Sequence, residues 1–509
     1  YALFGEYLPG ELAHRGYGLD QVVGQLAFGT EGIYGTPTYV SSSYIFLFIL
    51  FGAFLEQAGM IDLFTNFALG TVGHTKGGPA KVSVVSSGLM GTINGSGVAN
   101  VVTTGQFTIP LMKKFGYKPA FAGAVEATSS MGGQIMPPVM GAVAFIMAEN
   151  LNVPYAEIVK AAAVPAVLYY VTAFWMVHLE ASRRRLLGLP KEQCPDPWRA
   201  MRERWHLVLP LAVLVWMLFN GFTPMYSGMV GLALTAVLIL GSAIAGRIPA
   251  TAFRYVFWIV LGLACATLAE YGIVPVLAII AALVAQVFAV KGGRHTLHTM
   301  KQSLIDGALQ ALPVGVACAI VGVIIGILTL TGAASSFAGF ILQVGEHSLF
   351  LSLLLTMAVC LVLGMGIPTI PNYIITSAIA APALLKLGVP LIVSHMFVFY
   401  FGIMADLTPP VALAAFAASS IAKESAMKIG IKAVQIAIAG FVVPYMAVYD
   451  PQLMLQGDIT VTGVTYIVAK AVIAIALWGG AAIGYLRAPL NLFERLFAAA
   501  AAFMLVAAI

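Results

Sequence analysis

Runs of apolar residues about as long as a bilayer is thick recur along this sequence, and they constrain its fold more than any other feature. A helix that crosses roughly 30 Å of hydrocarbon needs about 20 apolar residues. Charged residues make up only 9% of the 509 positions, whereas a soluble domain carries about 25%. These charges are too few to cover a surface that faces water. The sequence therefore predicts an all-α integral membrane protein.

The predicted membrane helices lie between polar or basic loops. We expect clear spans at 155–177, 207–219, 225–245, 256–270, 273–290, 313–330, 431–448 and 463–486, and further helices at 43–54 and 492–509. The chain begins with Tyr1 rather than Met and ends within an apolar run. We therefore expect it to be clipped from a longer protein at both ends.

Two segments, 82–148 and 349–422, are apolar overall but are interrupted by Gly, Pro, Ser, Thr and Asn. Backbone groups left unpaired in lipid cost several kcal/mol each, so irregular backbone at membrane depth must face protein or a water-filled cavity. We therefore expect each segment to form a re-entrant helical hairpin followed by a broken helix. The prolines at 137–138 and 409–410 are expected to mark the breaks.

The two segments are copies of one another. Sliding the sequence without gaps until Asn100 falls on Asn372 superposes nine identities within positions 100 to 142. The matched residues are mostly polar or structure-breaking types, whereas chance similarity between apolar runs would match Leu and Ala. We interpret the segments as an internal repeat. The other identities include Thr104 with Thr376, Gly116 with Gly388, and Pro137–Pro138 with Pro409–Pro410.

Basic residues predict the orientation of the two copies. Lysines between 76 and 118 flank the first hairpin on both sides, which places both of its ends in the cytoplasm. The second hairpin is entered from outside, near Glu346 and His347, and its broken helix ends inside at Lys423. Lys386 does not fit this scheme. Two copies of opposite orientation form an inverted repeat, which is typical of secondary transporters that bind their ligands where the repeats meet.

The broken helices predict two ion-binding sites. A half-helix that ends within the membrane presents free carbonyls, which can replace the water shell of a cation, and the opposite end attracts anions. We expect the tip of each hairpin to face the broken helix of its own repeat. The result would be two similar oxygen cages suited to a hard cation such as sodium.

Several motifs resemble one transporter family. The segments 364–369, 387–389, 395–401 and 407–413 are similar to the large membrane subunit of tripartite ATP-independent periplasmic (TRAP) transporters, and their sequences are closest to the TAXI subtype. The segments 95–100 and 136–138 resemble the first-repeat counterparts. The resemblance implies an elevator mechanism driven by a sodium gradient, in which a periplasmic binding protein delivers an organic carboxylate. It also implies a smaller membrane subunit, which we expect to be fused N-terminally, and a bacterial or archaeal inner membrane.

The resemblance also assigns site residues. It implies that sodium is the coupling ion, with no other cofactor, and that the protein is not an enzyme. The expected sodium ligands are Asn94, Ser96, Gly133, Met136 and Pro138 in the first cage, and Gly366, Thr369, Ala405 and Thr408 in the second. The residues expected to contact the substrate are Asn100, Thr104, Asn372, Thr376 and Asp406.

The expected organisation has five parts. Residues 82–150 and 349–423 are the two cores of the transport domain. They alternate with N-terminal membrane and arm helices at 1–81, scaffold and connecting helices at 151–348, and C-terminal membrane helices at 424–509.

Other interpretations of these residues and of the function remain open. Asn100 and Asn372 could be helix N-caps, and Thr104 and Thr376 could bond only to their own helices. Glu126 could pair neighbouring helices. The protein could also be a stand-alone sodium/carboxylate symporter that needs no binding protein. The sequence contains no HExxH, GxSxG or Walker A motif, so an intramembrane enzyme or an ATP-driven pump is disfavoured.

Overall fold

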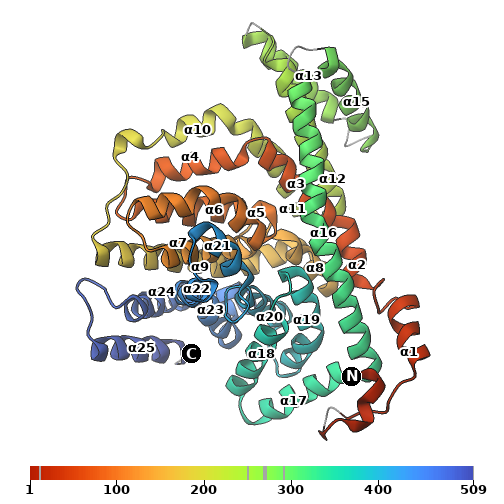
Figure 1. Cartoon of the computed structure of the whole chain (residues 1–509), viewed down its shortest axis with the longest axis vertical. Coiled ribbons are helices and arrows are strands. Elements are labelled where there is room, and N and C mark those ends of the chain that lie inside the picture. The colour runs from red at the N-terminus through yellow and green to blue at the C-terminus, as the bar shows by residue number, and fades with distance from the viewer. Residues whose placement is uncertain (11–12, 249–250, 267–271, 290–292, 508–509) are drawn as a thin grey trace. The chain divides into compact units, whose positions relative to one another are not determined.

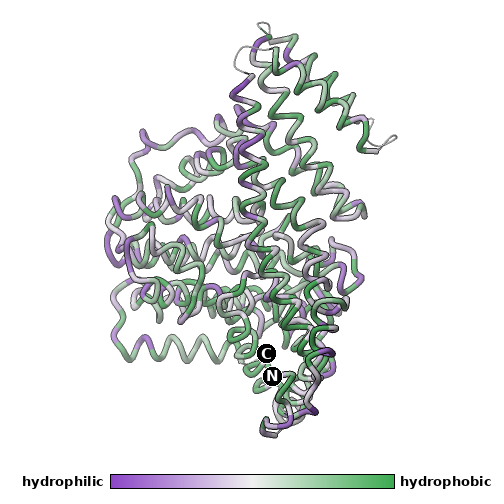
Figure 2. The backbone as a smooth tube through the Cα atoms, turned by 45° about the vertical axis from the view of Figure 1, so that its right-hand side comes forward, coloured by the Kyte–Doolittle hydropathy of each residue, from purple (hydrophilic) through white to green (hydrophobic). Residues whose placement is uncertain are grey.

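A computed structural model describes residues 1–10, 13–248, 251–266, 272–289 and 293–507. Within these ranges the chain forms helices joined by turns and loops, without a strand, which confirms the all-α prediction. Figure 2 shows helices that are apolar along much of their length, with hydrophilic residues gathered mainly in loops and at helix ends. Among the described residues, five helices are long and apolar enough to cross a membrane: Thr36–Gln57, Tyr155–Arg184, Pro224–Ala245, Gly293–Thr331 and Val461–Ile483.

Several predicted spans differ from the structure. Those expected at 207–219, 256–270 and 273–290 correspond to helices too short to be among the five, and residues 267–270 and 290 lie outside the described ranges. The span expected at 313–330 is part of one 39-residue helix, α16 (Gly293–Thr331), which continues through Pro313. Its first half is rich in polar residues, so the length of the apolar run did not reveal it. The run at 431–448 is divided into α22 (Ala426–Ile436) and α23 (Ile438–Tyr449), which are bent by 42°.

The chain divides into two compact units. The smaller comprises residues 42–64 and 198–313, and α12 (Pro224–Ala245) packs there against α3 (Phe46–Gln57), α11 (Val208–Phe219) and α15 (Val274–Ala289). Leu240, Val276 and Val287 lie in its buried core. The unit also contains α13 (Thr251–Ala266), most of α10 (Pro197–Arg204), and parts of α4 (Met60–Val72) and α16.

The larger unit contains both copies of the repeat. The first copy is α5 (Gly78–Asn94), α6 (Gly97–Lys114), α7 (Pro119–Gly132) and α8 (Gly141–Leu151), and the second is α18 (Leu349–Leu363), α19 (Thr369–Lys386), α20 (Leu391–Ala405) and α21 (Leu413–Ala422). The alignment of Asn100 with Asn372 carries both ends of α6 onto the ends of α19, and the first residues of α7 and α8 onto those of α20 and α21. The internal repeat is therefore present in the structure as well as in the sequence.

The backbone departs from helical geometry at equivalent places in the two copies. Gly116 and Gly388 have φ of +94° and +86°, and Met140 and Ala412 have φ of +58° and +46° just before α8 and α21 begin. The peptide bonds within Pro137–Pro138 and Pro409–Pro410 are both cis and lie between helices. The break that was predicted at each proline pair is thus present in both copies.

The two copies are interlocked through the second halves of their broken helices. The helix α21 packs on α6 and α7 of the first copy, whereas α8 of the first copy contacts α19 and α20 (Figure 1). One polar contact across this boundary is a hydrogen bond of 2.9 Å from Lys113 Nζ to the Ala422 carbonyl. Neither copy can therefore move as a separate body without breaking these contacts.

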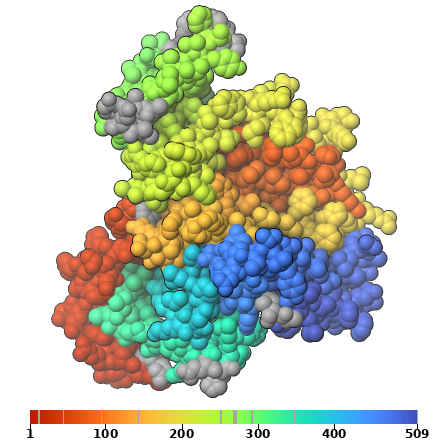
Figure 3. All heavy atoms as spheres, turned by 180° about the vertical axis from the view of Figure 1, so that it is seen from behind, coloured from red at the N-terminus to blue at the C-terminus, as the bar shows by residue number. Residues whose placement is uncertain are grey.

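Other helices of the larger unit surround the repeats. The long α9 (Tyr155–Arg184) packs on α7, α8, α23 and α24 (Val461–Ile483), and α24 packs on α25 (Leu492–Ala507). In Figure 3 the blue C-terminal helices lie against the light-orange region that includes α9. The remaining helices of the unit include α1 (Leu19–Val23), α2 (Thr36–Val40) and α17 (Ala333–His347).

Candidate functional site

The tip of the first hairpin lies against the break in the helix α7–α8. The helix α5 ends at Asn94, Gly95 turns with φ of +65°, and Ser96 caps α6 by accepting a hydrogen bond of 3.3 Å from Ala99 N. A Cβ atom placed on Gly97, at the start of α6, would lie 2.7 Å from Gln134 Nε2. The predicted pairing of the tip with the broken helix of its own repeat is therefore present in the first copy.

Glycine permits this close approach of two backbones. A Cβ atom on Gly91 would lie 2.8 Å from the Cα atom of Gly133 and 3.2 Å from Asn100 Nδ2. Any side chain at Gly91 would thus push the arm of the hairpin away from the break. Of the other first-cage residues, Met136 is extended and half-buried, and the Pro138 carbonyl lies 2.7 Å from the hydroxyl of Tyr155. The side chain of Asn94 lies outside the described part of the structure.

Asn100 lies in the fourth position of α6, and its side chain is fully buried. Its amide nitrogen donates to the Ser87 carbonyl at 2.8 Å, and its backbone carbonyl accepts a hydrogen bond of 2.7 Å from Thr104 Oγ1. The N-cap of this helix is Ser96, so the interpretation of Asn100 as an N-cap is wrong. The same applies to Asn372, because Pro368 precedes α19 as its N-cap.

In the second copy the hairpin tip also meets the broken helix. Thr369 Oγ1 donates to Asp406 Oδ2 at 3.0 Å, and Asn372 Nδ2 donates to the Gly402 carbonyl at 3.0 Å. The tip itself turns at Gly366, which has φ of +77°. Thr376 donates back to the Asn372 carbonyl at 2.8 Å, in agreement with the interpretation that it bonds to its own helix.

The two remaining residues of the second cage lie at the end of α20. Ala405 is buried and is the last residue of that helix. Thr408 is half-buried and donates to the Met404 carbonyl at 2.7 Å. The structure thus brings the second-cage residues to one break and one hairpin tip.

Four buried oxygen atoms at the two breaks have no hydrogen-bond partner within the described residues. They are Oδ1 of Asn100, Oε1 of Gln134, Oδ1 of Asn372 and Oδ1 of Asp406. The repeat relates them as two pairs, Asn100 with Asn372 and Gln134 with Asp406. A buried polar atom without a partner costs about 1–3 kcal/mol, and amide and carboxylate oxygens are preferred ligands of hard cations. Each copy therefore holds an amide oxygen and a second oxygen that can coordinate a cation.

Gln134 was not among the predicted ligands. Its equivalence to Asp406 is visible in the sequence once the two copies are aligned, so the repeat itself carried the signal. The structure adds that Gln134 is 1% exposed and that its amide nitrogen points to Met131 Sδ at 3.6 Å. Its oxygen is thus left free for another partner.

Glu126 on α7 ties three helices of the first copy together. Its carboxylate is fully buried and lies within hydrogen-bond distance of five hydroxyl groups. The two closest are Thr104 Oγ1 and Thr108 Oγ1, both at 2.5 Å. The other three are those of Ser83, Ser87 and Ser130, at 2.7, 2.7 and 3.1 Å.

These contacts decide two of the open interpretations. The structure confirms Glu126 as a residue that pairs helices, and the second copy has Val398 at the equivalent position. Thr104 bonds to Glu126 as well as to the Asn100 carbonyl, so the interpretation that it bonds only to its own helix is wrong.

The comparison with known families covers most of the chain. The model of the family described as tripartite ATP-independent periplasmic transporter, DctM component, matches residues 18–254 and 240–460. Together the two matches include both copies of the repeat.

Curated relatives match over shorter segments. The sialic acid TRAP transporter large permease protein SiaM of Vibrio cholerae is 28% identical over 178 residues, which are 35% of this chain and 41% of that protein. The C4-dicarboxylate TRAP transporter large permease proteins DctM of Pseudomonas aeruginosa and Rhodobacter capsulatus are 27% and 29% identical over 195 and 193 residues. These matches cover 38% and 35% of this chain, and 45% and 43% of the relatives. The chain thus spans less than half of the length of each of these relatives.

The family model matches both copies of the repeat and most of the chain, and this extent is enough to assign the chain to the family. The long apolar helices agree with this assignment. The chain is a multi-pass membrane protein that belongs to the DctM family, the large permease components of tripartite ATP-independent periplasmic transporters.

Proposed function

We propose that this protein is a sodium-coupled secondary importer of small organic carboxylates that works by an elevator mechanism. The main support is the pair of equivalent sites at the two breaks, each with two buried oxygens that lack a partner among the described residues. The two repeats are interlocked and would move together. Binding of a cation at both sites could therefore be required before this movement begins. The names of the relatives, which are permeases for sialic acid and C4-dicarboxylates, favour an organic acid as the substrate.

The proposed ion ligands combine the predicted and the observed oxygens. In the first copy they are the carbonyls near Asn94, Ser96, Gly133, Met136 and Pro138, joined by the side-chain oxygens of Asn100 and Gln134. In the second copy they are Gly366, Thr369, Ala405 and Thr408, joined by Asn372 and Asp406. The two asparagines would thus coordinate an ion, rather than contact only the substrate. Thr104 and Thr376 hold the backbone of the asparagines in place.

The hairpins are proposed to be re-entrant and to face opposite sides of the membrane. In an elevator mechanism, residues 82–150 and 349–423 would move together as the transport domain. The contacts of α8 and α21 with the opposite copy support such a joint movement. The remaining parts, among them residues 151–348, would include the scaffold.

The partners are proposed from the family and from the motifs. The permease would lie in the inner membrane, and a TAXI-type periplasmic binding protein would deliver the substrate to it. A small membrane subunit, fused N-terminally, would complete the permease. The second candidate function, a stand-alone sodium/carboxylate symporter, makes a different prediction about the binding protein.

Uptake by proteoliposomes tests the proposal. A radiolabelled carboxylate, such as a C4-dicarboxylate or sialic acid, is offered with an inward sodium gradient or an equal potassium gradient, each with and without the binding protein. We expect uptake only with both sodium and the binding protein. Uptake that needs sodium but not the binding protein would favour the symporter, and uptake that ignores sodium would refute ion coupling.

A further inference from the structure

A cavity of about 140 Å³ lies in the larger unit, and none of the residues at the two breaks lines it. This volume is far larger than the roughly 10–15 Å³ that one water molecule requires, so the cavity has room for several waters or for one phosphate-sized anion. It lies among the beginning of α7, the ends of α9 and α24, and α22. The residues that line it are Lys118, Ala120, Phe121, Glu180, Arg183, Arg184, Lys432, Gln435, Ile436, Ala482 and Ile483.

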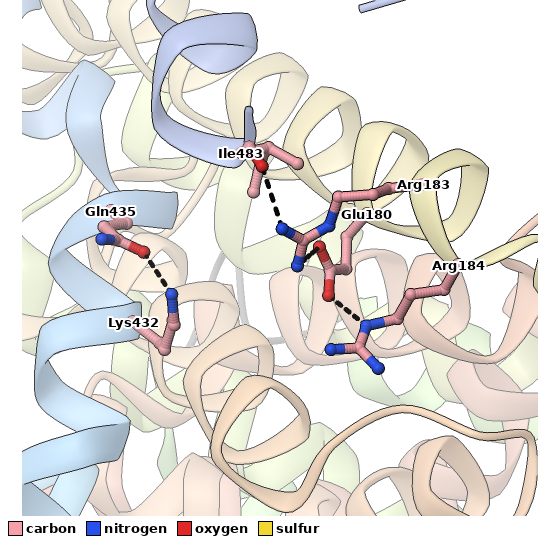
Figure 4. A network of polar contacts seen from close by, with 6 residues as sticks. All are labelled: Glu180, Arg183, Arg184, Lys432, Gln435 and Ile483. Carbon is pink, nitrogen blue, oxygen red and sulfur yellow. Dashed lines mark hydrogen bonds and ion pairs between the residues drawn. The ribbon is translucent and has the colours of Figure 1, made fainter. Parts of the chain in front are cut away.

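The charged lining of this cavity is strongly positive. Four basic residues and one acidic residue give a formal charge of +3, as four minus one. The acidic residue, Glu180, is only 2% exposed, and it lies between two arginines of its own helix (Figure 4). Arg183 Nη2 contacts Glu180 Oε2 at 2.7 Å, and Arg184 Nε contacts Glu180 Oε1. One buried carboxylate therefore orients two guanidinium groups, while most of the positive charge remains unbalanced.

Lys432 and the other terminal nitrogen of Arg183 have uncharged partners. Lys432 Nζ donates to the neutral Gln435 Oε1 at 2.9 Å, and Arg183 Nη1 donates to the Ile483 carbonyl at 3.2 Å (Figure 4). Neither contact removes a charge. Like charges that converge on one pocket repel one another, and water screens part of this repulsion because Lys118, Arg183 and Lys432 are exposed. An anion in the cavity would relieve this repulsion.

The beginning of α7 adds a further attraction for anions. This helix has 14 residues, and no side chain caps its first turn. The first intrahelical hydrogen bond runs from Ala122 N to the Lys118 carbonyl, at 2.9 Å. The N–H groups before Ala122 have no intrahelical partner, and two of them belong to Ala120 and Phe121, which line the cavity. The positive end of the helix dipole thus faces the same space as the basic side chains.

We propose that this cavity binds a phosphate-type oxyanion, supplied either by the head group of an anionic phospholipid or by free inorganic phosphate. Each of the two oriented guanidinium groups has five N–H donors and keeps some that its contacts with Glu180 and the Ile483 carbonyl do not use, and these can donate to such a group. The two lysines and the first turn of α7 would contact its remaining oxygens. This site is independent of the proposed ion sites and does not rest on the proposed function.

The experiment compares two double variants of the purified full-length protein. K118Q/K432Q removes two cations from the cavity, and K114Q/K428Q removes two cations of the same segments that do not line it. Binding of dioctanoyl phosphatidylglycerol, dioctanoyl phosphatidylcholine and inorganic phosphate is measured by the shift in melting temperature at constant ionic strength. A third variant, K118R/K432R, keeps the charge and shows whether loss of binding follows charge rather than misfolding.

We expect phosphatidylglycerol or inorganic phosphate to raise the melting temperature of the native protein, of K114Q/K428Q and of K118R/K432R. K118Q/K432Q should bind about tenfold or more weakly, since a hydrogen bond to a charged group contributes about 1.5–3 kcal/mol. A response to phosphatidylglycerol alone identifies a lipid site, and a response to both anions identifies a site for the phosphate group itself. Equal binding by the two glutamine variants, or a response to no anion, would overturn the proposal. In that case the basic residues would serve only to set the membrane orientation.

Discussion

Replacing Gly91 by alanine tests the close contact between the first hairpin and its broken helix. The new Cβ atom would lie 2.8 Å from the Cα atom of Gly133, which belongs to the backbone and cannot give way as the end of a flexible side chain could. Overpacking of this kind typically costs about 1–3 kcal/mol. To relieve the contact, the hairpin must separate from the break, which also separates the proposed sodium ligands. We therefore expect sodium binding to become weaker by about this free energy. The sodium concentration for half-maximal uptake should therefore rise roughly 5- to 150-fold.

The matched control is Gly339→Ala. Gly339 also lies within a helix of the larger unit, and a Cβ atom there meets no other atom within 4 Å. Both substitutions raise helix propensity by about 1 kcal/mol, so the difference between them reports the steric contact alone. Sodium-dependent uptake in proteoliposomes is measured for both variants. A sodium dependence of Gly91→Ala equal to that of Gly339→Ala would refute the reasoning.

Three further substitutions test single contacts. Thr369→Val removes the hydroxyl that donates to Asp406 and should reduce sodium-dependent uptake by an amount equivalent to about 1.5–3 kcal/mol. Thr369→Ser keeps a hydroxyl and should retain the uptake. Equal uptake by both variants would contradict this role. Ser96→Ala removes an N-cap and should cost about 1 kcal/mol of stability. The sodium dependence should remain, since the proposed ligand is the Ser96 carbonyl. A loss of sodium dependence would show that the hydroxyl binds the ion. Glu126→Leu removes the acceptor that five buried hydroxyl groups share, and those without a second acceptor, such as Ser83, are left unsatisfied at a cost of roughly 1–3 kcal/mol each. It should therefore lower the melting temperature far more than Glu126→Gln does. An unchanged melting temperature would show that the cluster does not hold the helices together.

Most of the features that could be predicted from the sequence followed from the internal repeat. The alignment of Asn100 with Asn372 also places the helix boundaries and the two breaks, because Gly and Pro restrict the backbone locally. The opposite orientation of the copies in a membrane stays a prediction, as does the five-part division of the chain.

Contacts between distant segments could not be predicted from the sequence. The break after Ile436 falls in an apolar run whose proline, Pro444, lies eight residues further on, inside α23. In the structure Thr128 of α7 donates to the Ala433 carbonyl, one turn before the break, at 3.3 Å. The hydroxyl groups around Glu126 come from three helices, and no spacing along the chain reveals which of them converge. The basic cavity likewise depends on Lys432, which lies far along the chain from Arg183.

The central claim is that each repeat holds one ion site, and it depends on the side-chain oxygens of Gln134 and Asp406. Gln134→Met and Asp406→Leu remove these oxygens while keeping a side chain of similar size. The decisive measurement is the rise in melting temperature of the purified protein when sodium chloride replaces choline chloride. We predict a reduced rise in each single variant and no rise in the double variant. A double variant that responds to sodium as the native protein does would contradict the account.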